Sequence, residues 1–200
     1  RDFAALRKRL GNRSNLAAGR GDLGTQVIHF RQAFHGRSGY TLSLTNTADP
    51  RKTDHFPKFD WPRIDNPRIV FPLERHLAEV EAAEARAVAQ IEEAVASHGH
   101  DIACLIVEPI QAEGGDNHFR PEFLRTLRRL ADRHDFLLIF DEVQTGLGMT
   151  GSMWAWQQLG VEPDLFAFGK KVQVCGLAAG RRIDEVADNV FRVPSRINST

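Results

Sequence analysis

FLLIFDEVQTGLGMTGSMWAWQQLGVEPDLFAFGKK, residues 136–171, carries the clearest structural signal in the chain. One apolar run, residues 136–140, ends at Asp141, and a second run, residues 165–168, ends one glycine before Lys170. Short apolar runs separated by a helical segment are typical of strands buried in a parallel sheet. Ligands bind where such strands end, so the two charged residues predict a functional edge of the sheet.

The spacing of Asp141 and Lys170 is that of neighbouring strands, because 29 residues (170 − 141) is the length of one strand–helix–strand unit. We therefore expect both side chains to face one ligand. A lysine packed behind Phe166 and Phe168 would be partly desolvated, which lowers the pKa of its amine and favours Schiff-base formation. A buried carboxylate needs a cation or a hydrogen-bond donor. An aldehyde cofactor with a basic ring nitrogen would suit both residues.

The same residues allow simpler interpretations. Asp141 could cap the next element, and Lys170 and Lys171 could be solvated lysines of a turn. Strand alternation would send the two lysines to opposite faces, which leaves open which of them acts. Residues 146–151 match GxGxxG, as in a nicotinamide-dependent oxidoreductase, although Asp141 and Glu142 just before them would repel a pyrophosphate. A catalytically inactive structural domain is the third alternative.

Strand and helix patterns alternate along the chain. We expect strands at residues 25–30, 102–107, 136–140, 165–168 and 172–178, and helices at residues 73–96, 121–134, 152–159 and 182–190. The proline- and aspartate-rich residues 47–73 predict an irregular excursion. This order predicts an α/β fold, with a mostly parallel sheet and helices on both faces.

Composition narrows the classes of partner. The 200 residues are 42% hydrophobic, which is enough for one sizeable core. Basic and acidic residues number 26 each, so net charge gives no reason to expect nucleic acid or an anionic membrane as a partner. No apolar run approaches the ~20 residues that span a bilayer. Two cysteines, Cys104 and Cys175, fit a reducing cytoplasm, and we expect both to be buried.

Two glutamates follow the strand expected at residues 102–107. Glu108 and Glu113 could serve there as acid, base or partner of a cation, or they could be solvated loop charges. The eight histidines do not form a metal-binding pattern, because the pair in His98-Gly99-His100 has no third ligand at a suitable spacing. We therefore expect no metal.

Three motifs together resemble the class III (ornithine-type) aminotransferases, which use pyridoxal 5′-phosphate. They are residues 140–146 (FDEVQTG) with Lys170 one unit later, residues 34–37 (FHGR) and residues 108–111 (EPIQ). The resemblance implies the large cofactor domain of the fold-type I enzymes. Residues 1–200 would be part of that domain, with the phosphate-loop region upstream and the C-terminal small domain outside the chain.

The resemblance implies how the cofactor would be held. Lys170 would form the Schiff base and move the substrate proton, and Asp141 would keep the pyridine nitrogen protonated. Gln144 would contact the ring hydroxyl, and Phe34 would stack on the ring. Thr200 would reach the cofactor phosphate of the other subunit in a homodimer.

A narrower likeness is to the members of the family that act on lysine, and it rests on residues 168–176 (FGKKVQVCG), 56–63 and 194–200. It implies transfer of the terminal amino group of L-lysine to 2-oxoglutarate, which gives 2-aminoadipate 6-semialdehyde and glutamate. Arg37 would clamp a substrate carboxylate, and Glu113 would be a switch that pairs with an arginine outside the chain. The alternative donors are ornithine, diaminobutyrate and 4-aminobutyrate.

Overall fold

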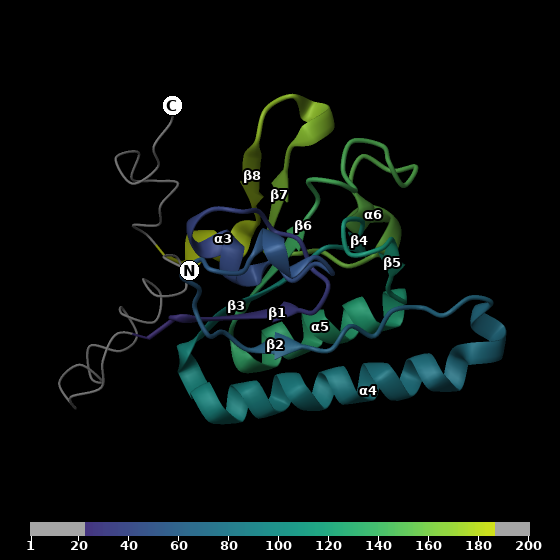
Figure 1. Ribbon diagram of the computed structural model, residues 1–200, viewed down its shortest axis with the longest axis horizontal. Coiled ribbons are helices and arrows are strands. Elements are labelled where there is room, and N and C mark those ends of the chain that lie inside the picture. Colours follow the sequence, from purple (N-terminus) through teal and green to yellow (C-terminus); the bar gives the residue numbers. More distant parts are fainter. Residues whose placement is uncertain (1–22, 187–200) are drawn as a thin grey trace.

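The computed structural model describes residues 23–186, which form an α/β fold around one large sheet (Figure 1). Its strand order is β2-β1-β3-β6-β7-β8. The strands are β1 (Gln26–Phe30), β2 (Arg63–Ile64), β3 (Ile102–Val107), β6 (Leu137–Asp141), β7 (Leu165–Phe168) and β8 (Gly176–Ala179). Neighbouring strands run parallel except β7 and β8, which form an antiparallel hairpin. The expected mostly parallel sheet is confirmed.

Helices and short turns connect the strands. The helices are α3 (Gly39–Leu44), α4 (Leu73–His98), α5 (Pro121–His134) and α6 (Ala155–Leu159). The 3-10 helices are η1 (Pro50–Lys52), η2 (Gly99–Asp101), η3 (Lys170–Val172) and η4 (Arg181–Glu185), and β4 (Ile110–Gln111) with β5 (Asn117–His118) forms a separate small hairpin. Within the described residues, no helix combines the length and the apolar character needed to cross a lipid bilayer.

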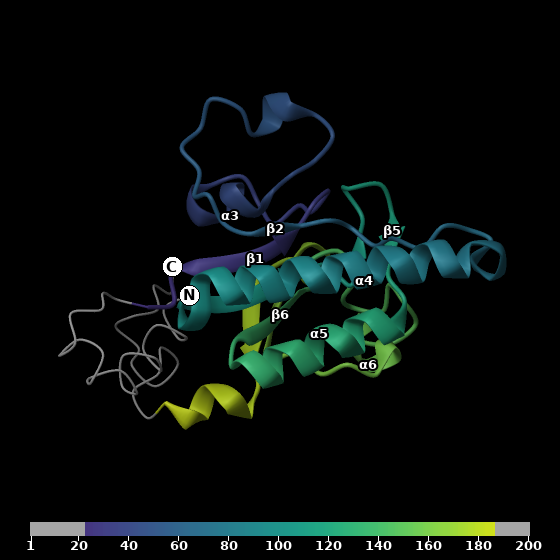
Figure 2. The same cartoon turned by 90° about the horizontal axis from the view of Figure 1, so that it is seen from below.

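The two long helices, α4 and α5, lie side by side against one face of the sheet (Figures 1 and 2). In α4, Val80, Ala87 and Ile91 are buried at helical spacing and form the stripe that packs on the strands. In α5, Pro121 occupies the first turn, where its missing N–H is not needed, and Asp135, in a left-handed conformation, caps the end of the helix after His134. The sequence expectations for both helices are confirmed.

Strand β6 shows how side chains are divided between the two faces. Leu138 and Phe140 point into the core cluster formed with α4 and α5. Leu137 belongs to the opposite cluster, against which Ile139 packs. Because side chains alternate along a strand, Asp141 falls on the face away from the two long helices. The end of β6 therefore presents a carboxylate on the sheet face that the long helices do not cover.

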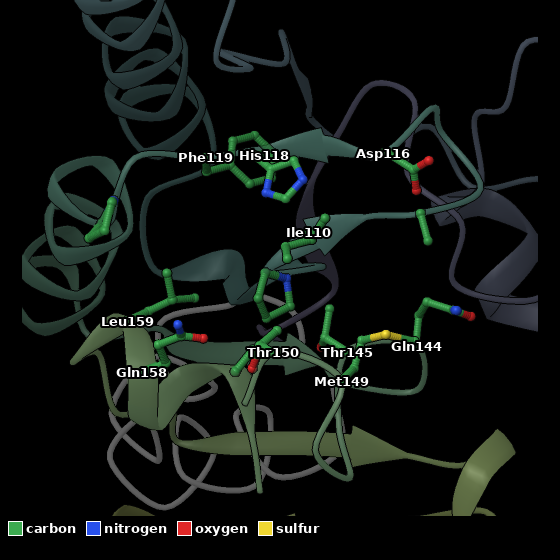
Figure 3. Close-up of a pocket in the computed structure, with 14 residues that line it drawn as sticks. Ile110, Asp116, His118, Phe119, Gln144, Thr145, Met149, Thr150, Gln158 and Leu159 are labelled. Atoms are coloured by element: carbon green, nitrogen blue, oxygen red, sulfur yellow. The ribbon is translucent and has the colours of Figure 1, made fainter. Parts of the chain in front are cut away.

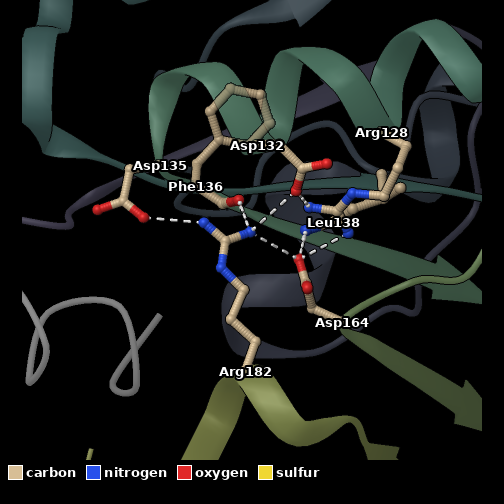
Figure 4. Close-up of polar contacts among 7 residues, drawn as sticks. All are labelled: Arg128, Asp132, Asp135, Phe136, Leu138, Asp164 and Arg182. Carbon is tan, nitrogen blue, oxygen red and sulfur yellow. Dashed lines mark hydrogen bonds and ion pairs between the residues drawn. The ribbon is translucent and has the colours of Figure 1, made fainter. Parts of the chain in front are cut away.

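The amino edge of the sheet is fixed by a buried carboxylate, Asp164 (Figure 4). Its Oδ2 accepts from the Leu138 amide at 2.7 Å and lies 3.0 Å from Arg128 and 3.2 Å from Arg182. Arg182 comes from η4 and also donates to the Phe136 carbonyl at 3.0 Å. The network joins the segment after β8 to α5 and β6, and so anchors the base of the β7–β8 hairpin.

The structure adds elements that the sequence did not reveal. Helix α3, strand β2 and the β4–β5 hairpin were not expected, and β2, β4 and β5 are two residues each, too short to show a period. Cys104 is buried as expected, but the expectation for Cys175 was wrong, because it lies exposed before β8 begins at Gly176. Of the helix expected at residues 182–190, the described part is the 3-10 helix η4.

Candidate active site

Loops that follow four parallel strands meet at the carboxyl edge of the sheet. They follow β1, β3, β6 and β7, and they enclose a cavity of about 220 Å³. The cavity is lined by Phe34, His35, Gly36, Glu108, Ala112, Glu113, Asp141, Val143, Gln144 and Lys170. Asp141 and Lys170 therefore lie at the same edge of the sheet and line one cavity.

Asp141 is buried, with 8% of its surface exposed, and its carboxylate has two polar neighbours. The Nδ1 atom of His35 lies 2.8 Å from Oδ2, and the Val143 amide donates to Oδ1 at 3.1 Å. Sequence reasoning required a partner for this carboxylate but did not find His35, which is 106 residues away. The available signal was the position of His35 in the loop that follows the strand at residues 25–30.

The loop that carries His35 is held by side-chain hydrogen bonds. The His35 amide donates to Thr45 Oγ1 at 3.1 Å, and that hydroxyl donates to the Gly36 carbonyl at 2.6 Å. Gly36 has φ of 118°, a conformation that favours glycine. The imidazole of His35 is buried, and its Nε2 has no hydrogen-bond partner among the described residues. The loop thus fixes the ring against Asp141.

Glu108 is buried rather than solvated, so the simpler interpretation of this residue was wrong. Its Oε1 accepts a hydrogen bond from the Phe34 amide at 2.8 Å. Burial raises the pKa of the Glu108 carboxyl to about 7, and nearby Asp141 acts in the same direction, while His35 and the amide hydrogen bonds oppose it. Glu108 therefore ties the β1 loop to the β3 loop inside the cavity.

The two lysines lie in η3, not in a strand, so strand alternation does not apply to them. The Lys170 amine donates to the side-chain oxygen of Gln144, and the Lys171 amine donates to the Gln144 carbonyl at 2.6 Å. Of the two, only Lys170 lines the cavity. Lys170 is exposed, so the expected packing behind Phe166 and Phe168 is not found.

The remaining residues implied by the family likeness differ in position. Glu113 lines the cavity, and its carboxylate lies 2.5 Å from the amine of Lys52, a residue that sequence reasoning did not connect with the site. Arg37 is exposed and is not among the residues that line the cavity. Thr200 lies outside the described residues.

The GxGxxG segment, residues 146–151, does not form a phosphate site at a helix. It lies in a turn, and the helix that follows, α6, already has a carboxylate at its first amides. Glu142 accepts from the Ala155 amide at 3.0 Å and from the Trp156 amide at 2.9 Å. Those donors are what a pyrophosphate would need, so the geometry disfavours a dinucleotide here.

A second, larger cavity of about 690 Å³ adjoins the first and shares Ala112 and Gln144 with it (Figure 3). It lies between the β4–β5 hairpin, which contributes His118, and the loop after β6, which contributes Thr145 and Met149. Because the two cavities share these residues, the space at the site continues past Gln144 from the small cavity into the larger one.

The chain matches a known protein family and is similar to several of its members. The family model described as "Aminotransferase class-III" matches residues 7–192. The L-lysine-epsilon aminotransferase of Mycobacterium tuberculosis is 64% identical over 178 residues, which cover 89% of this chain and 39% of that protein. The protein of the same name from Streptomyces clavuligerus is 57% identical over 88% of this chain and 38% of its own length.

One further relative and one solved structure are also similar to the chain. The 4-aminobutyrate aminotransferase of Schizosaccharomyces pombe is 42% identical over 76% of this chain and 32% of its own length. The structure of a lysine aminotransferase from M. tuberculosis superposes with a TM-score of 0.89 at 59% identity, over 100% of this chain and 44% of that one. The chain thus spans about two fifths of the length of the two L-lysine-epsilon aminotransferases named above.

Proposed function

Because this chain belongs to the class III aminotransferases, we propose that the whole protein is a transaminase that removes the terminal amino group of L-lysine. The acceptor is 2-oxoglutarate, and the products are 2-aminoadipate 6-semialdehyde and glutamate. The observation that carries the proposal is a buried carboxylate, Asp141, and an amine, Lys170, in one cavity. Lysine is preferred as donor because relatives named for lysine are 57–64% identical to the chain, against 42% for the S. pombe relative named for 4-aminobutyrate.

The residues of the cavity fit pyridoxal 5′-phosphate. Asp141 offers a carboxylate for a protonated ring nitrogen, Lys170 offers a primary amine for an aldehyde, and Phe34 and Val143 supply apolar walls. Gln144 lies beside the Lys170 amine, where it would reach a ring hydroxyl. When bound, the cofactor supplies an aldehyde that takes up amino groups and a ring that withdraws electrons from the reacting carbon.

The chain's own residues then have distinct tasks. Asp141 holds a proton at the ring nitrogen, and His35 and the Val143 amide fix the carboxylate so that it cannot turn away. Lys170 moves the proton at the substrate carbon with its amine, which the Gln144 side chain orients. The Lys171 amine donates a hydrogen bond to the Gln144 carbonyl and so stabilises the turn that presents Lys170.

Arg37 and Glu113 bind the ends of the substrates in this proposal. A guanidinium can form two parallel hydrogen bonds to a carboxylate, so Arg37 clamps the carboxylate of the amino acid. Glu113 is the switch that distinguishes a donor with a terminal amine from an acceptor with a second carboxylate. We propose further that the protein is a cytoplasmic homodimer in which Thr200 reaches the cofactor phosphate of the other subunit.

The absorbance spectrum of the full-length protein tests the assignment of the lysine. We expect a long-wavelength band from the cofactor that remains with the protein after gel filtration. The variant Lys170→Ala should lose this band, and Lys171→Ala, the matched control, should keep it. A wild-type protein without the band, or a band that survives in Lys170→Ala, would contradict the proposal.

A product assay tests the donor. Lysine, ornithine, 2,4-diaminobutyrate and 4-aminobutyrate are each supplied with 2-oxoglutarate, and glutamate formation is measured. We expect the highest kcat/KM with lysine. A higher value with 4-aminobutyrate or ornithine would keep the family assignment and reject the proposed substrate.

A further inference from the structure

The carboxylate of Glu113 forms an ion pair with Lys52, a partner that the resemblance to the family did not imply. The Nζ atom of Lys52 lies 2.5 Å from Glu113 Oε1, and the two side chains are 34% and 46% exposed. Lys52 is the last residue of η1, in the excursion between β1 and β2. Glu113 lines the cavity but Lys52 does not, so Lys52 meets the carboxylate from outside the cavity.

Glu113 stands among three cations. The pKa of its carboxyl is lowered first by the hydrogen bond and charge of Lys52, and then by the charges of Lys170 and Arg37. Of these, Lys170 lines the cavity, whereas Lys52 and Arg37 do not. The carboxylate can therefore either offset the positive charge inside the site or be held outward by Lys52.

The backbone next to Glu113 is held by hydrogen bonds and close packing, so we expect the change between these two states to occur by rotation of the side chain. The Asn117 side chain donates to the Gly114 carbonyl at 3.1 Å and to Gln111 at 3.0 Å. Gly114 packs so closely that an added Cβ would lie 2.0 Å from the Gln32 carbonyl oxygen. The turn thus fixes the backbone position of Glu113. The cations that pair with its carboxylate determine the direction in which the side chain points.

We propose that Lys52 is a specificity-determining residue that holds Glu113 outward while the site receives a dicarboxylate. This inference rests on the proposed function, in which one site alternates between a diamine-type donor and a dicarboxylate acceptor. With Glu113 bound to Lys52, the carboxylate of Glu113 does not offset the positive charge of Lys170, which can attract a second carboxylate while Arg37 holds the first. Without Lys52, Glu113 turns toward these cations and repels that carboxylate.

The variant Lys52→Met of the full-length, cofactor-loaded protein tests the proposal. Glutarate, an unreactive dicarboxylate, is titrated by calorimetry, and pentanoate is the monocarboxylate control. Exposed ion pairs contribute little individually, so we expect the Kd for glutarate to rise about two- to fivefold, with that for pentanoate unchanged. In turnover, KM for 2-oxoglutarate should rise by the same factor while KM for lysine does not.

Matched variants separate a specific role from general charge or folding effects. Lys58→Met removes the same charge from an exposed position on the same excursion and should leave glutarate binding unchanged. Lys52→Arg should retain wild-type affinity, and in a Glu113→Gln background Lys52→Met should have no further effect. The inference is overturned if Lys52→Met binds glutarate like the wild type, or if Lys58→Met weakens binding equally. Wild-type protein that does not convert lysine at all would overturn the proposed function instead.

Discussion

At the scale of single residues, the site depends on where carboxylates are buried. Asp141 and Glu108 both lie in the interior at strand ends, but their surroundings differ. Asp141 faces His35 and the Val143 amide, whereas the pKa of Glu108 is raised, chiefly by burial. Glu108 therefore binds its proton more tightly than an ordinary glutamate does, as is common for acids at functional sites.

Glu108 makes stability depend on pH. The folded pKa of about 7 lies above the ordinary value of 4.5, so between these values the folded chain binds more protons than the unfolded chain. The contribution of Glu108 to the free energy of unfolding is therefore fully present below pH 4.5 and is lost as the pH rises through about 7. We expect Glu108→Gln, which keeps an acceptor for the Phe34 amide, to be more stable than the wild type at pH 8 by up to about 3 kcal/mol.

Denaturant unfolding at pH 5 and pH 8 measures this difference. At pH 5 the free energies of unfolding of the two proteins should be similar. Glu93→Gln, an exposed carboxylate on α4, is the control and should show no such change. An equal difference between Glu108→Gln and the wild type at both pH values would contradict the assignment of the raised pKa.

At the scale of elements, the β7–β8 hairpin presents the proposed catalytic lysine, and its base is held by ion pairs. η3 forms the tip of this hairpin, and η4 follows β8. Arg182 of η4 joins Asp164, which precedes β7, to Asp135, which precedes β6 (Figure 4). The hairpin is therefore fixed at the edge of the sheet opposite the cavity, while its tip reaches the cavity.

Arg182→Met should destabilise the protein by about 2–4 kcal/mol. The substitution removes one of the positive charges beside the buried Asp164 carboxylate and the guanidinium that donates to the Phe136 carbonyl. Arg181→Met removes an exposed charge next to it and should change stability by no more than about 0.5 kcal/mol. Denaturant midpoints give both values. Equal midpoints for the two variants would show that the network does not hold the hairpin.

At the scale of the molecule, the described residues are united by a core between the sheet and the helices α4 and α5. Phe123 of α5 is 1% exposed, and its ring meets those of Phe30 and Phe119 at centroid distances of 6.0 and 5.9 Å. These rings come from a helix, a strand and the segment before the helix. The contact between the rings links the sheet to the layer formed by α4 and α5. Figure 2 shows this layer of helices.

Phe123→Ala should lower the free energy of unfolding by about 3–5 kcal/mol, since it removes a large buried side chain and leaves a cavity. The control is Phe56→Ala, because Phe56 is 55% exposed and contributes little to the core. Phe123 does not line the proposed site, so the absorbance of bound cofactor should be retained while the protein is folded. A loss of stability equal to that of Phe56→Ala would contradict this view of the core.

Local patterns were sufficient to predict the main strands and the two long helices. Apolar runs and helical spacing placed β1, β3, β6, β7, α4 and α5 close to their observed bounds, because these depend on residues near in sequence. The same patterns put Asp141 and Lys170 at strand ends, one unit apart. They did not reveal the short elements, and they wrongly gave Lys170 and Lys171 the geometry of a strand.

The partners of the site residues depended on how the strands assemble. His35 meets Asp141 across 106 residues, Phe34 meets Glu108 across 74, and Lys52 meets Glu113 across 61. No local pattern encodes such pairs, because they exist only once β1 lies beside β3 and β3 beside β6. The sequence thus provides the reactive groups at strand ends, and strand order with loop packing sets which groups meet and how deeply each is buried.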